Sequence, residues 1–361
     1  MADDRDLLPS EQPVQLLDES GRAVENPDLP FPDNERLLAA YTALVVGRRV
    51  NDQAGALVRQ GRLAVYPSSH GQEACQVGAS LVLGENDWLF PTYRDTVAVV
   101  TRGVDPVEVL TLLKGDWHAG YDPYEHRVAP QATPLATQLL HAVGVAHAAR
   151  LRGEDTVVMA LCGDGATSEG DFHEALNFAA VFKAPVVFFV QNNEYAISVP
   201  LARQTAAPSL AHKGIGYGVN GERVDGNDTA AVLAVLGRAV EAARSGAGPQ
   251  LVEAHTYRMQ AHTNADDDTR YRDSDEVDPW VARDPLTRLE ALLKRKRVLT
   301  KARSEEIVER AEAVAAAMRE GVSRDTDPHP SELFAHVYAE TTPQLKEQAA
   351  ILADELSRES D

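Results

Sequence analysis

The sequence predicts an α/β protein built on a doubly wound, mainly parallel sheet, with a helical C-terminal region. Short, fully apolar runs alternate with helical stretches in the middle of the chain, a pattern typical of parallel strands covered by helices on both faces. We expect strands at 156–161, 185–191 and 251–256, because these runs are short and rich in β-branched and aromatic residues.

Helical periodicity predicts most of the other elements. Apolar residues recur at helical spacing from 34 to 61, and a second helix should follow 68–71, where a serine can cap it. Further helices are expected at 170–182, 285–296 and 304–320. The first 33 residues are polar and contain several prolines, so they should form an extended arm. The chain thus divides into the arm at 1–33, a sheet domain at 34–278 and a helical region at 279–361.

The composition excludes several classes of function. Asp and Glu total 55 against 35 Lys and Arg, a formal net charge of −20 that disfavours binding to nucleic acid or an anionic membrane. Cys75 and Cys162 alone cannot build a disulfide framework or a cysteine metal site. The start is acidic, unlike a signal peptide, and no apolar run is long enough to span a bilayer, so we expect a cytoplasmic protein.

Polar residues follow the first two predicted strands. Gly163-Asp164-Gly165 comes after one strand and Asn192-Asn193 after the next. Asp164 and Asn193 are 29 positions apart (193 − 164), which is enough for a helix and a crossover to a parallel strand. Ligands of parallel sheets bind at the carboxyl ends of the strands, so both side chains should lie at one binding edge.

These residue types suit a magnesium diphosphate ligand. A carboxylate, an amide oxygen and a nearby carbonyl are the ligands that Mg²⁺ takes, with phosphate and water completing its shell. The glycines allow close approach of a diphosphate, and the helix beyond Ser168 offers N–H groups to the anion. The simpler alternative to a ligand site is that Gly163-Asp164-Gly165 is only a tight turn and that Asn192-Asn193 only ends a strand. The Asn pair at one crossover's distance favours the ligand.

The stretch from Gly163 to Ser198 closely resembles the thiamine-diphosphate signature, and in detail the alpha subunit of two-chain pyruvate and branched-chain 2-oxoacid dehydrogenases. Further matches lie at 71–74 (GQEA), 91–95 (PTYRD), 134–138 (PLATQ), 221–228 and 257–272, so the resemblance spans about 35–345. It implies a thiamine-diphosphate-binding fold in which residues 34–278 form the domain that binds the diphosphate.

The resemblance also implies roles for individual residues. Mg²⁺ would be bound by the side chains of Asp164 and Asn193 and the carbonyl of Tyr195. The cofactor would be contacted by a wider set, which comprises Tyr93, Arg94, Thr133, Leu135, Gly163, Asp164, Gly165, Ala166, Asn193, Tyr195, Arg258 and His262. Within it, Tyr93 and Arg94 match the diphosphate-binding pair, and the backbone at Thr133 and Leu135 would hold the aminopyrimidine.

His262 matches the active-site histidine of the family, which helps to transfer the acyl group to lipoamide. Arg258 and the Asp and Arg residues at 266–272 should order its loop through ion pairs once cofactor binds. Thr137 and Gln138 match a loop that binds potassium in some relatives.

This sequence departs from the family pattern at three positions. Gln191 stands where some relatives have an arginine that reaches the diphosphate, Ala261 replaces a Gly or His, and Thr263 occupies the position of a phosphorylated serine. The first leaves a charge contact in doubt, and the second leaves the loop geometry in doubt.

The activity implied is the thiamine-dependent oxidative decarboxylation of a 2-oxoacid with reductive acylation of a lipoyl group. The glutamate that activates thiamine belongs to a second domain that this chain lacks the length to contain. We therefore expect a beta subunit in an α2β2 heterotetramer, and a lipoyl-bearing acyltransferase as a further partner. The substrate would be a small 2-oxoacid, with a branched-chain acid favoured over pyruvate.

Four alternatives stay open at this point. An acetoin dehydrogenase alpha subunit shares the same motifs, and a non-catalytic paralogue would share the fold. A freestanding thiamine-dependent decarboxylase is disfavoured by the length of the chain. A nicotinamide-dependent dehydrogenase is disfavoured because no G-x-G-x-x-G follows a predicted strand.

Overall fold

The computed structural model describes residues 7–115, 120–324 and 329–359. The first six residues of the predicted arm, and residues 325–328 and 360–361 of the predicted C-terminal region, lie outside the described residues. Contacts divide the chain into two compact units, Met1–Val322 and Ser323–Asp361. The first unit therefore includes the two helices predicted at 285–296 and 304–320. The predicted boundaries at 33 and 278 remain predictions.

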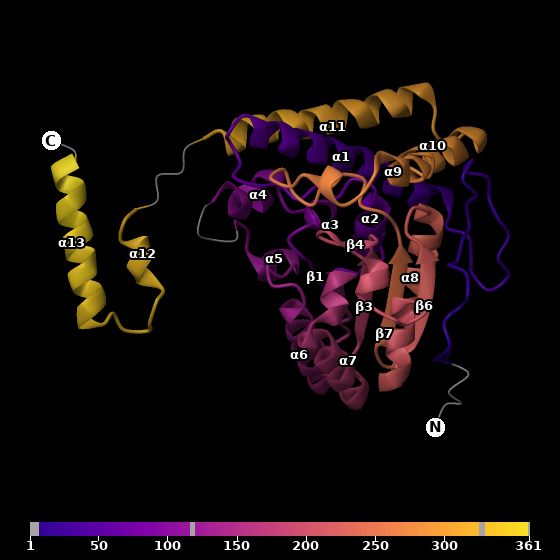
Figure 1. Cartoon of the computed structure of the whole chain (residues 1–361), viewed down its shortest axis with the longest axis horizontal. Coiled ribbons are helices and arrows are strands. Elements are labelled where there is room, and N and C mark those ends of the chain that lie inside the picture. Colours follow the sequence, from indigo (N-terminus) through magenta and orange to yellow (C-terminus); the bar gives the residue numbers. More distant parts are fainter. Residues whose placement is uncertain (1–6, 116–119, 325–328, 360–361) are drawn as a thin grey trace. The chain divides into compact units, whose positions relative to one another are not determined.

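A parallel sheet forms the centre of the first unit (Figure 1). Its strands, in the order β1-β2-β3-β7-β6, are β1 Trp88–Phe90, β2 Val158–Gly163, β3 Val186–Asn192, β7 Gln250–His255 and β6 Asn220–Asp225. The predicted parallel sheet is confirmed, with all four pairings parallel. The two edge strands escaped prediction, because β1 is three residues long and β6 carries charged residues in its middle.

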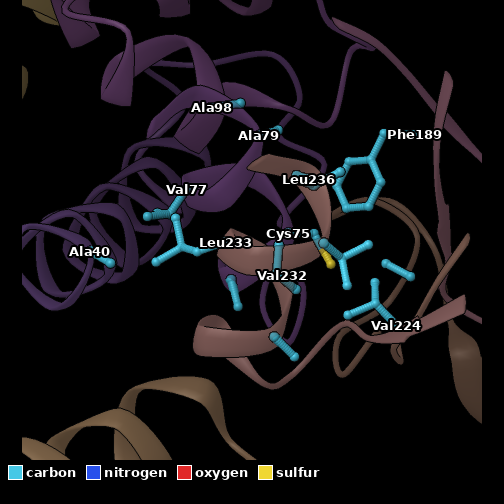
Figure 2. Packing of buried hydrophobic residues seen from close by; sticks show 14 of the residues in the cluster. Ala40, Cys75, Val77, Ala79, Ala98, Phe189, Val224, Val232, Leu233 and Leu236 are labelled. Carbon is cyan, nitrogen blue, oxygen red and sulfur yellow. The ribbon is translucent and has the colours of Figure 1, made fainter. Parts of the chain in front are cut away.

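Alternate residues of the strands enter two hydrophobic cores, one on each face of the sheet. Met159, Phe189 and Val252 belong to the core under α1 Asn34–Arg59, α2 Glu73–Leu81, α3 Thr96–Thr101 and α8 Thr229–Arg244. Figure 2 shows part of this core, where Val77 and Cys75 of α2 lie with Leu233 and Val232 of α8. On the other face, Phe188 packs with α6 Thr137–Arg152 and α7 Gly170–Phe182. Helices on both faces explain why the central strands are apolar throughout.

The other helices of the first unit are α4 Pro106–Lys114, α5 Pro123–His126, α9 Ser274–Val281, α10 Pro285–Arg295 and α11 Lys301–Val322. Helices α1, α4 and α11 share a third core that includes Leu57, Leu110 and Met318. In the second unit the described helices are α12 Glu332–Ala335 and α13 Pro343–Glu359. None of the helices in the described part of the chain is long and apolar enough to cross a membrane.

Two details differ from the sequence-based expectations. No serine caps α2: the helix begins after Gln72, and the Ser69 hydroxyl instead lies within hydrogen-bond distance of Asn51. The described residues of the predicted arm form turns and isolated bridges, and part of the segment packs against the sheet unit. Leu16 and Leu17 are buried, and Val14 forms a parallel bridge with Val224, because these apolar side chains can be covered only by the sheet unit.

Candidate functional site

The carboxyl ends of adjacent strands line a cavity of about 540 Å³. The segment after β1 carries Tyr93 and Arg94, β2 leads into Asp164, and β3 leads into Asn193. The structure brings eleven of the twelve predicted cofactor residues to its lining, which includes Tyr93, Arg94, Thr133, Leu135, Gly163, Asp164, Gly165, Ala166, Asn193, Tyr195 and His262. This is where parallel sheets bind ligands, and the volume suits a cofactor.

Three oxygen-bearing groups converge at one side of the cavity. The end of the Asn193 amide that faces this side lies 3.3 Å from Asp164 Oδ1 and 3.1 Å from the carbonyl oxygen of Tyr195. An octahedral Mg²⁺ with ligands at about 2.1 Å would place neighbouring ligand oxygens about 3.0 Å apart. If the amide presents its oxygen here, that oxygen accepts from the Tyr195 N–H at 3.3 Å, and the three acceptors together form a set that fits a small hard cation. If it presents nitrogen, it donates to both neighbours instead.

The turn after β3 positions Asn193 and the Tyr195 carbonyl. Glu194 and Ile197 adopt left-handed backbone conformations, with φ of 72° and 56°. Asn192 holds the turn, because its side-chain oxygen accepts from the Glu194 N–H at 3.2 Å while its amide donates to Glu253. Strained residues of this kind persist where the surroundings fix them, commonly at functional sites. Here they flank Tyr195, whose carbonyl oxygen lies beside the Asn193 amide.

Asp164 is almost fully buried and is held by an amide. Burial raises the pKa of its carboxyl, and a hydrogen bond from Gln204 Nε2 to Oδ2, at 2.6 Å, lowers it. A cation at Oδ1 would favour the charged form much more strongly. The buried carboxylate is therefore a feature that a bound metal ion explains.

Beyond Asp164 the chain forms the 3-10 turn η2 Gly165–Ser168 and then α7. A Cβ at Gly165 would lie 2.8 Å from that of Ala196, so only glycine fits between this turn and the Tyr195 loop. Lys213 Nζ donates to the Thr167 carbonyl at 2.7 Å and holds the turn from behind. The backbone N–H groups at the start of such a turn and helix can bind an anion.

Arg94 is a buried residue that lines the cavity and also contacts neighbouring loops. Its guanidinium donates to the Ser68 carbonyl at 2.9 Å, contacts His262 Nδ1 at 2.9 Å and lies 5.6 Å from the ring centroid of Tyr93. A guanidinium has five N–H donors, so these contacts leave donors for an anion in the cavity. Tyr93 is half-buried and also lines the cavity.

His262 is held as a neutral imidazole. Because the Arg94 guanidinium can only donate, His262 Nδ1 must accept, and the ring proton is on Nε2. Burial, together with the charges of Arg94 and Arg258, lowers the pKa of His262 to about 4. The side chain therefore stays uncharged at neutral pH and offers an Nε2–H donor to a ligand in the cavity.

The loop after β7 is ordered mainly by hydrogen bonds between a charged side chain and a neutral group. Buried Arg258 donates to the Ile197 carbonyl and to the Tyr271 hydroxyl, both at 2.8 Å. The Tyr271 hydroxyl donates to Asp266 at 2.5 Å, and Asp266 accepts from the backbone N–H of His262 at 2.8 Å. Arg258 itself does not line the cavity. It supports His262 from behind, and its direct contact with a cofactor remains a prediction.

The predicted ion pairs account for only part of this order. Arg272 pairs with Asp268 at 2.5 Å and also donates to the carbonyl of Arg258.

One rim of the cavity is open. Leu135 is 42% exposed, Ile197 55% and Val199 41%, and Thr133 beside them is exposed as well. Apolar side chains gathered on a surface next to a cavity are typical of a site completed by another protein.

Sequence reasoning missed several residues of the site. Gln204 had no signal in the sequence, because its contact with Asp164 arises from the hairpin β4 Tyr195–Ala196 and β5 Val199–Pro200, which leads into the short helix η3 Leu201–Arg203. Gln72 lies in a quoted motif without an assigned role, and it also lines the cavity. Asp95 is fully buried, and burial raises the pKa of its carboxyl while hydrogen bonds from Gln191 and Thr92 oppose that rise.

Comparison with known families decides what kind of protein this is. The sequence profile of the dehydrogenase E1 component family matches residues 41–331. The chain belongs to this family. The E1 assignment confirms the predicted family, the oxidoreductase class and the thiamine-diphosphate-type α/β fold.

Similar E1 proteins are alpha subunits. The 3-methyl-2-oxobutanoate dehydrogenase subunit alpha of Mycobacterium tuberculosis (strain ATCC 25618 / H37Rv) is 47% identical over 351 residues, covering 96% of this chain and 95% of that protein. The pyruvate dehydrogenase E1 component subunit alpha of Staphylococcus aureus (strain Mu50 / ATCC 700699) is 37% identical over 347 residues, covering 96% and 94%. This E1 chain is thus an alpha-type component of a 2-oxoacid dehydrogenase.

Proposed function

We propose that this chain binds magnesium thiamine diphosphate in the cavity at the carboxyl ends of β1, β2 and β3, and acts on a branched-chain 2-oxoacid such as 3-methyl-2-oxobutanoate. The observation that carries the proposal is the convergence of Asp164, Asn193 and the Tyr195 carbonyl beside Arg94 and His262 in one cavity. The choice of a branched-chain acid rests on the relative that is 47% identical, against 37% for the pyruvate enzyme.

The residues present fit this cofactor. Asp164, Asn193 and the Tyr195 carbonyl would hold Mg²⁺, and no group of three or more His, Cys, Asp or Glu offers another metal site among the described residues. The N–H groups at Gly165 and Ala166, with Tyr93 and Arg94, would hold the diphosphate. When bound, thiamine diphosphate supplies an electron sink for loss of CO₂.

The chain's own groups then have separate tasks. Arg94 neutralises phosphate charge and keeps His262 Nδ1 occupied, so that His262 presents Nε2–H towards the cavity. A neutral imidazole with a low pKa can donate a hydrogen bond without adding a charge. Cys162 lines the cavity, but burial raises the pKa of its thiol, so it does not act as a nucleophile.

A beta subunit would complete the site. The described residues contain one parallel sheet unit and no second sheet domain that could supply the activating glutamate. The exposed apolar rim at Leu135, Ile197 and Val199 is where such a subunit would cover the cavity. An α2β2 assembly, a lipoyl-bearing acyltransferase as acyl acceptor and a cytoplasmic location belong to the same proposal.

A potassium ion near Gln138 is part of the proposal as well. Gln138 Nε2 donates to the carbonyls of Leu135 and Leu161, while its buried Oε1 has no partner among the described residues. An unpaired buried oxygen is costly unless a donor or cation satisfies it. A monovalent cation at this loop would do so.

The proposal is tested by an activity assay on the chain co-purified with its beta chain. Thiamine diphosphate, Mg²⁺ and a redox dye would be present, with 3-methyl-2-oxobutanoate, pyruvate and acetoin supplied separately. We expect kcat/KM for 3-methyl-2-oxobutanoate to exceed that for pyruvate by about 10-fold or more, as a few apolar contacts can provide. The proposal would be overturned if only acetoin reacted, or if none of the three compounds reacted.

The role of His262 is tested by separating two half-reactions. His262→Ala should lower acyl transfer to a lipoyl domain by about 100-fold or more, the usual contribution of a positioned proton donor, and should lower decarboxylation much less. Equal loss of both reactions would instead mean that His262 only positions the cofactor.

A further inference from the structure

Two glutamine side chains link Asn193 to the buried carboxylate of Asp95 in the wall of the cavity. Asn193 Nδ2 donates to Gln72 Oε1 at 2.9 Å, and Gln72 Nε2 donates to Gln191 Oε1 at 3.2 Å. Gln191 Nε2 then donates to Asp95 Oδ1 at 2.7 Å. All four side chains are buried, so solvent does not compete for these bonds. We call Asn193, Gln72 and Gln191 the amide chain.

The direction of this chain is set at its Asp95 end. Asp95 Oδ1 accepts from Gln191 and from Gln76 at 3.0 Å, and Oδ2 accepts from the Thr92 N–H at 2.7 Å. Three donors around one carboxyl favour its charged form, which has acceptors only. Gln191 must therefore turn its NH₂ group towards Asp95 and its oxygen towards Gln72.

Each amide passes the constraint to the next, because every amide has one accepting end and one donating end. The oxygen of Gln191 requires the NH₂ of Gln72, and the oxygen of Gln72 requires the NH₂ of Asn193. The Asn193 oxygen is then left facing Asp164 and the Tyr195 carbonyl. Turning Asn193 over would reverse the chain and place the oxygen of Gln191 against the Asp95 carboxylate.

We propose that Asp95 and the amide chain fix the orientation of Asn193 so that its oxygen, not its nitrogen, faces the magnesium position. The inference rests on the proposed function, since it assumes a metal ion at that position. It makes Asp95, Gln191 and Gln72 positioning residues. It also gives Gln191, which departs from the arginine of some relatives, a defined role in this chain.

Isosteric exchanges test the proposal in the complex of the chain with its beta chain. In Asp95→Asn, the Thr92 N–H retains the amide oxygen of the new side chain, so its NH₂ group faces Gln191 and reverses the amide chain. In the double variant Asp95→Asn with Gln191→Glu, the Glu carboxylate accepts from both neighbours and the original direction returns. Gln76 donates to the Arg94 carbonyl at 3.1 Å as well as to Asp95, so both variants lose its bond to residue 95 alike and the comparison between them is unaffected.

The measurement is the Mg²⁺ concentration that gives half-maximal binding of thiamine diphosphate, followed by calorimetry. Asp95→Asn should require about 10-fold or more Mg²⁺, the usual loss when the partner of a metal ligand is removed. The double variant should return to within about threefold of the parent, because the direction of the amide chain is restored. Gln76→Met is the matched control: it removes a donor to Asp95 but lies outside the amide chain, and should match the parent.

Two results would overturn the proposal: Asp95→Asn binding Mg²⁺ like the parent, or the double variant binding no better than Asp95→Asn. If Asp95→Asn does not fold, Gln72→Met replaces it, since it removes the partner of Asn193 and should show the same loss. If the parent complex itself binds thiamine diphosphate without dependence on Mg²⁺, the metal site of the proposed function has failed, which is a different outcome.

Discussion

At the scale of single residues, the site depends on a few buried polar groups whose charge states follow from their neighbours. Burial raises the pKa of Asp164, and burial together with two guanidinium groups keeps His262 neutral. Both are understandable if the cavity holds a metal ion and a diphosphate, because the cation favours the carboxylate and the anion accepts from the imidazole.

Asp164→Ala should abolish Mg²⁺-dependent binding of thiamine diphosphate without lowering the thermal stability of the cofactor-free protein. Its carboxylate is a metal ligand in the proposal, and its burial is unfavourable without the metal. Calorimetric binding and a thermal melt would measure the two effects. Asp155→Ala, which removes an exposed carboxylate, is the control and should bind as the parent does. Retained binding in Asp164→Ala would remove Asp164 from the metal site.

Arg94→Met should raise the pKa of His262 from about 4 towards its usual value of 6.5, because a positive charge and a donor to Nδ1 are lost. In the parent, the unfolded state binds this proton between pH 6.5 and 4 while the folded state does not. The contribution of His262 to folding stability therefore rises with pH across that window, and should do so less steeply in Arg94→Met. Titration of ¹³C-labelled imidazoles by NMR measures the shift. A parent His262 that titrates near 6.5 would contradict it.

At the scale of elements, close helix packing holds the polar ends of the strands in place. Helix α2, which begins beside the cavity, packs on α8 through Gly78, where a Cβ would lie 2.4 Å from Val232 Cγ1. This contact lets α2 lie close to α8 while Gln72 at its start reaches Asn193. The cavity wall is therefore formed both by residues at the ends of the strands and by residues at the start of a packed helix.

Gly78→Ala should destabilise the protein by about 1–3 kcal/mol, because the new methyl group overpacks against Val232. Gly237→Ala on α8 is the matched control: a Cβ there meets nothing within 4 Å, so the higher helix propensity of alanine should stabilise by about 1 kcal/mol. Equilibrium unfolding in urea measures both. Equal effects of the two substitutions would contradict the packing argument.

At the scale of the first unit, a buried arginine joins segments that are far apart in the sequence. Arg288 of α10 pairs with Asp225 at the end of β6 at 3.0 Å and donates to the Leu17 carbonyl of the arm at 2.6 Å. Asp228 caps α8 and accepts from the backbone of Leu16. The arm, the sheet edge and α10 are thereby connected through one polar cluster.

Arg288→Met should lower the free energy of unfolding by about 3–5 kcal/mol, because it leaves the Asp225 and Asp228 carboxyls without their cation. Hydrogen exchange at residues 14–18 should increase as the arm loses its anchor. Arg295→Met, which removes an exposed contact with the Ser20 carbonyl, should change stability by less than about 0.5 kcal/mol. Unchanged exchange in the arm of Arg288→Met would show that apolar burial alone holds it.

Much of this protein could be read from local patterns. The central strands β2 and β3 and the helix α7 between them were predicted within about two residues, since burial on both faces requires continuous apolar runs. The same order placed Asp164 and Asn193 at one edge, and the resemblance named eleven residues that line the cavity. Edge strands β1 and β6 could not be read, because a short or charged strand has no periodic pattern of its own.

Tertiary structure alone decided how the site is held. The contacts of Gln204 with Asp164 and of Arg94 with His262, and the amide chain from Asn193 to Asp95, join segments separated by long stretches of sequence. A glutamine is a common surface residue, and nothing in its neighbours along the chain shows which end of its amide will be bound. The sequence by itself determined which polar side chains stand at the strand ends, because those residues directly follow the apolar runs of the strands. The orientation of those side chains is a property of buried hydrogen bonds, which exist only once the chain has folded.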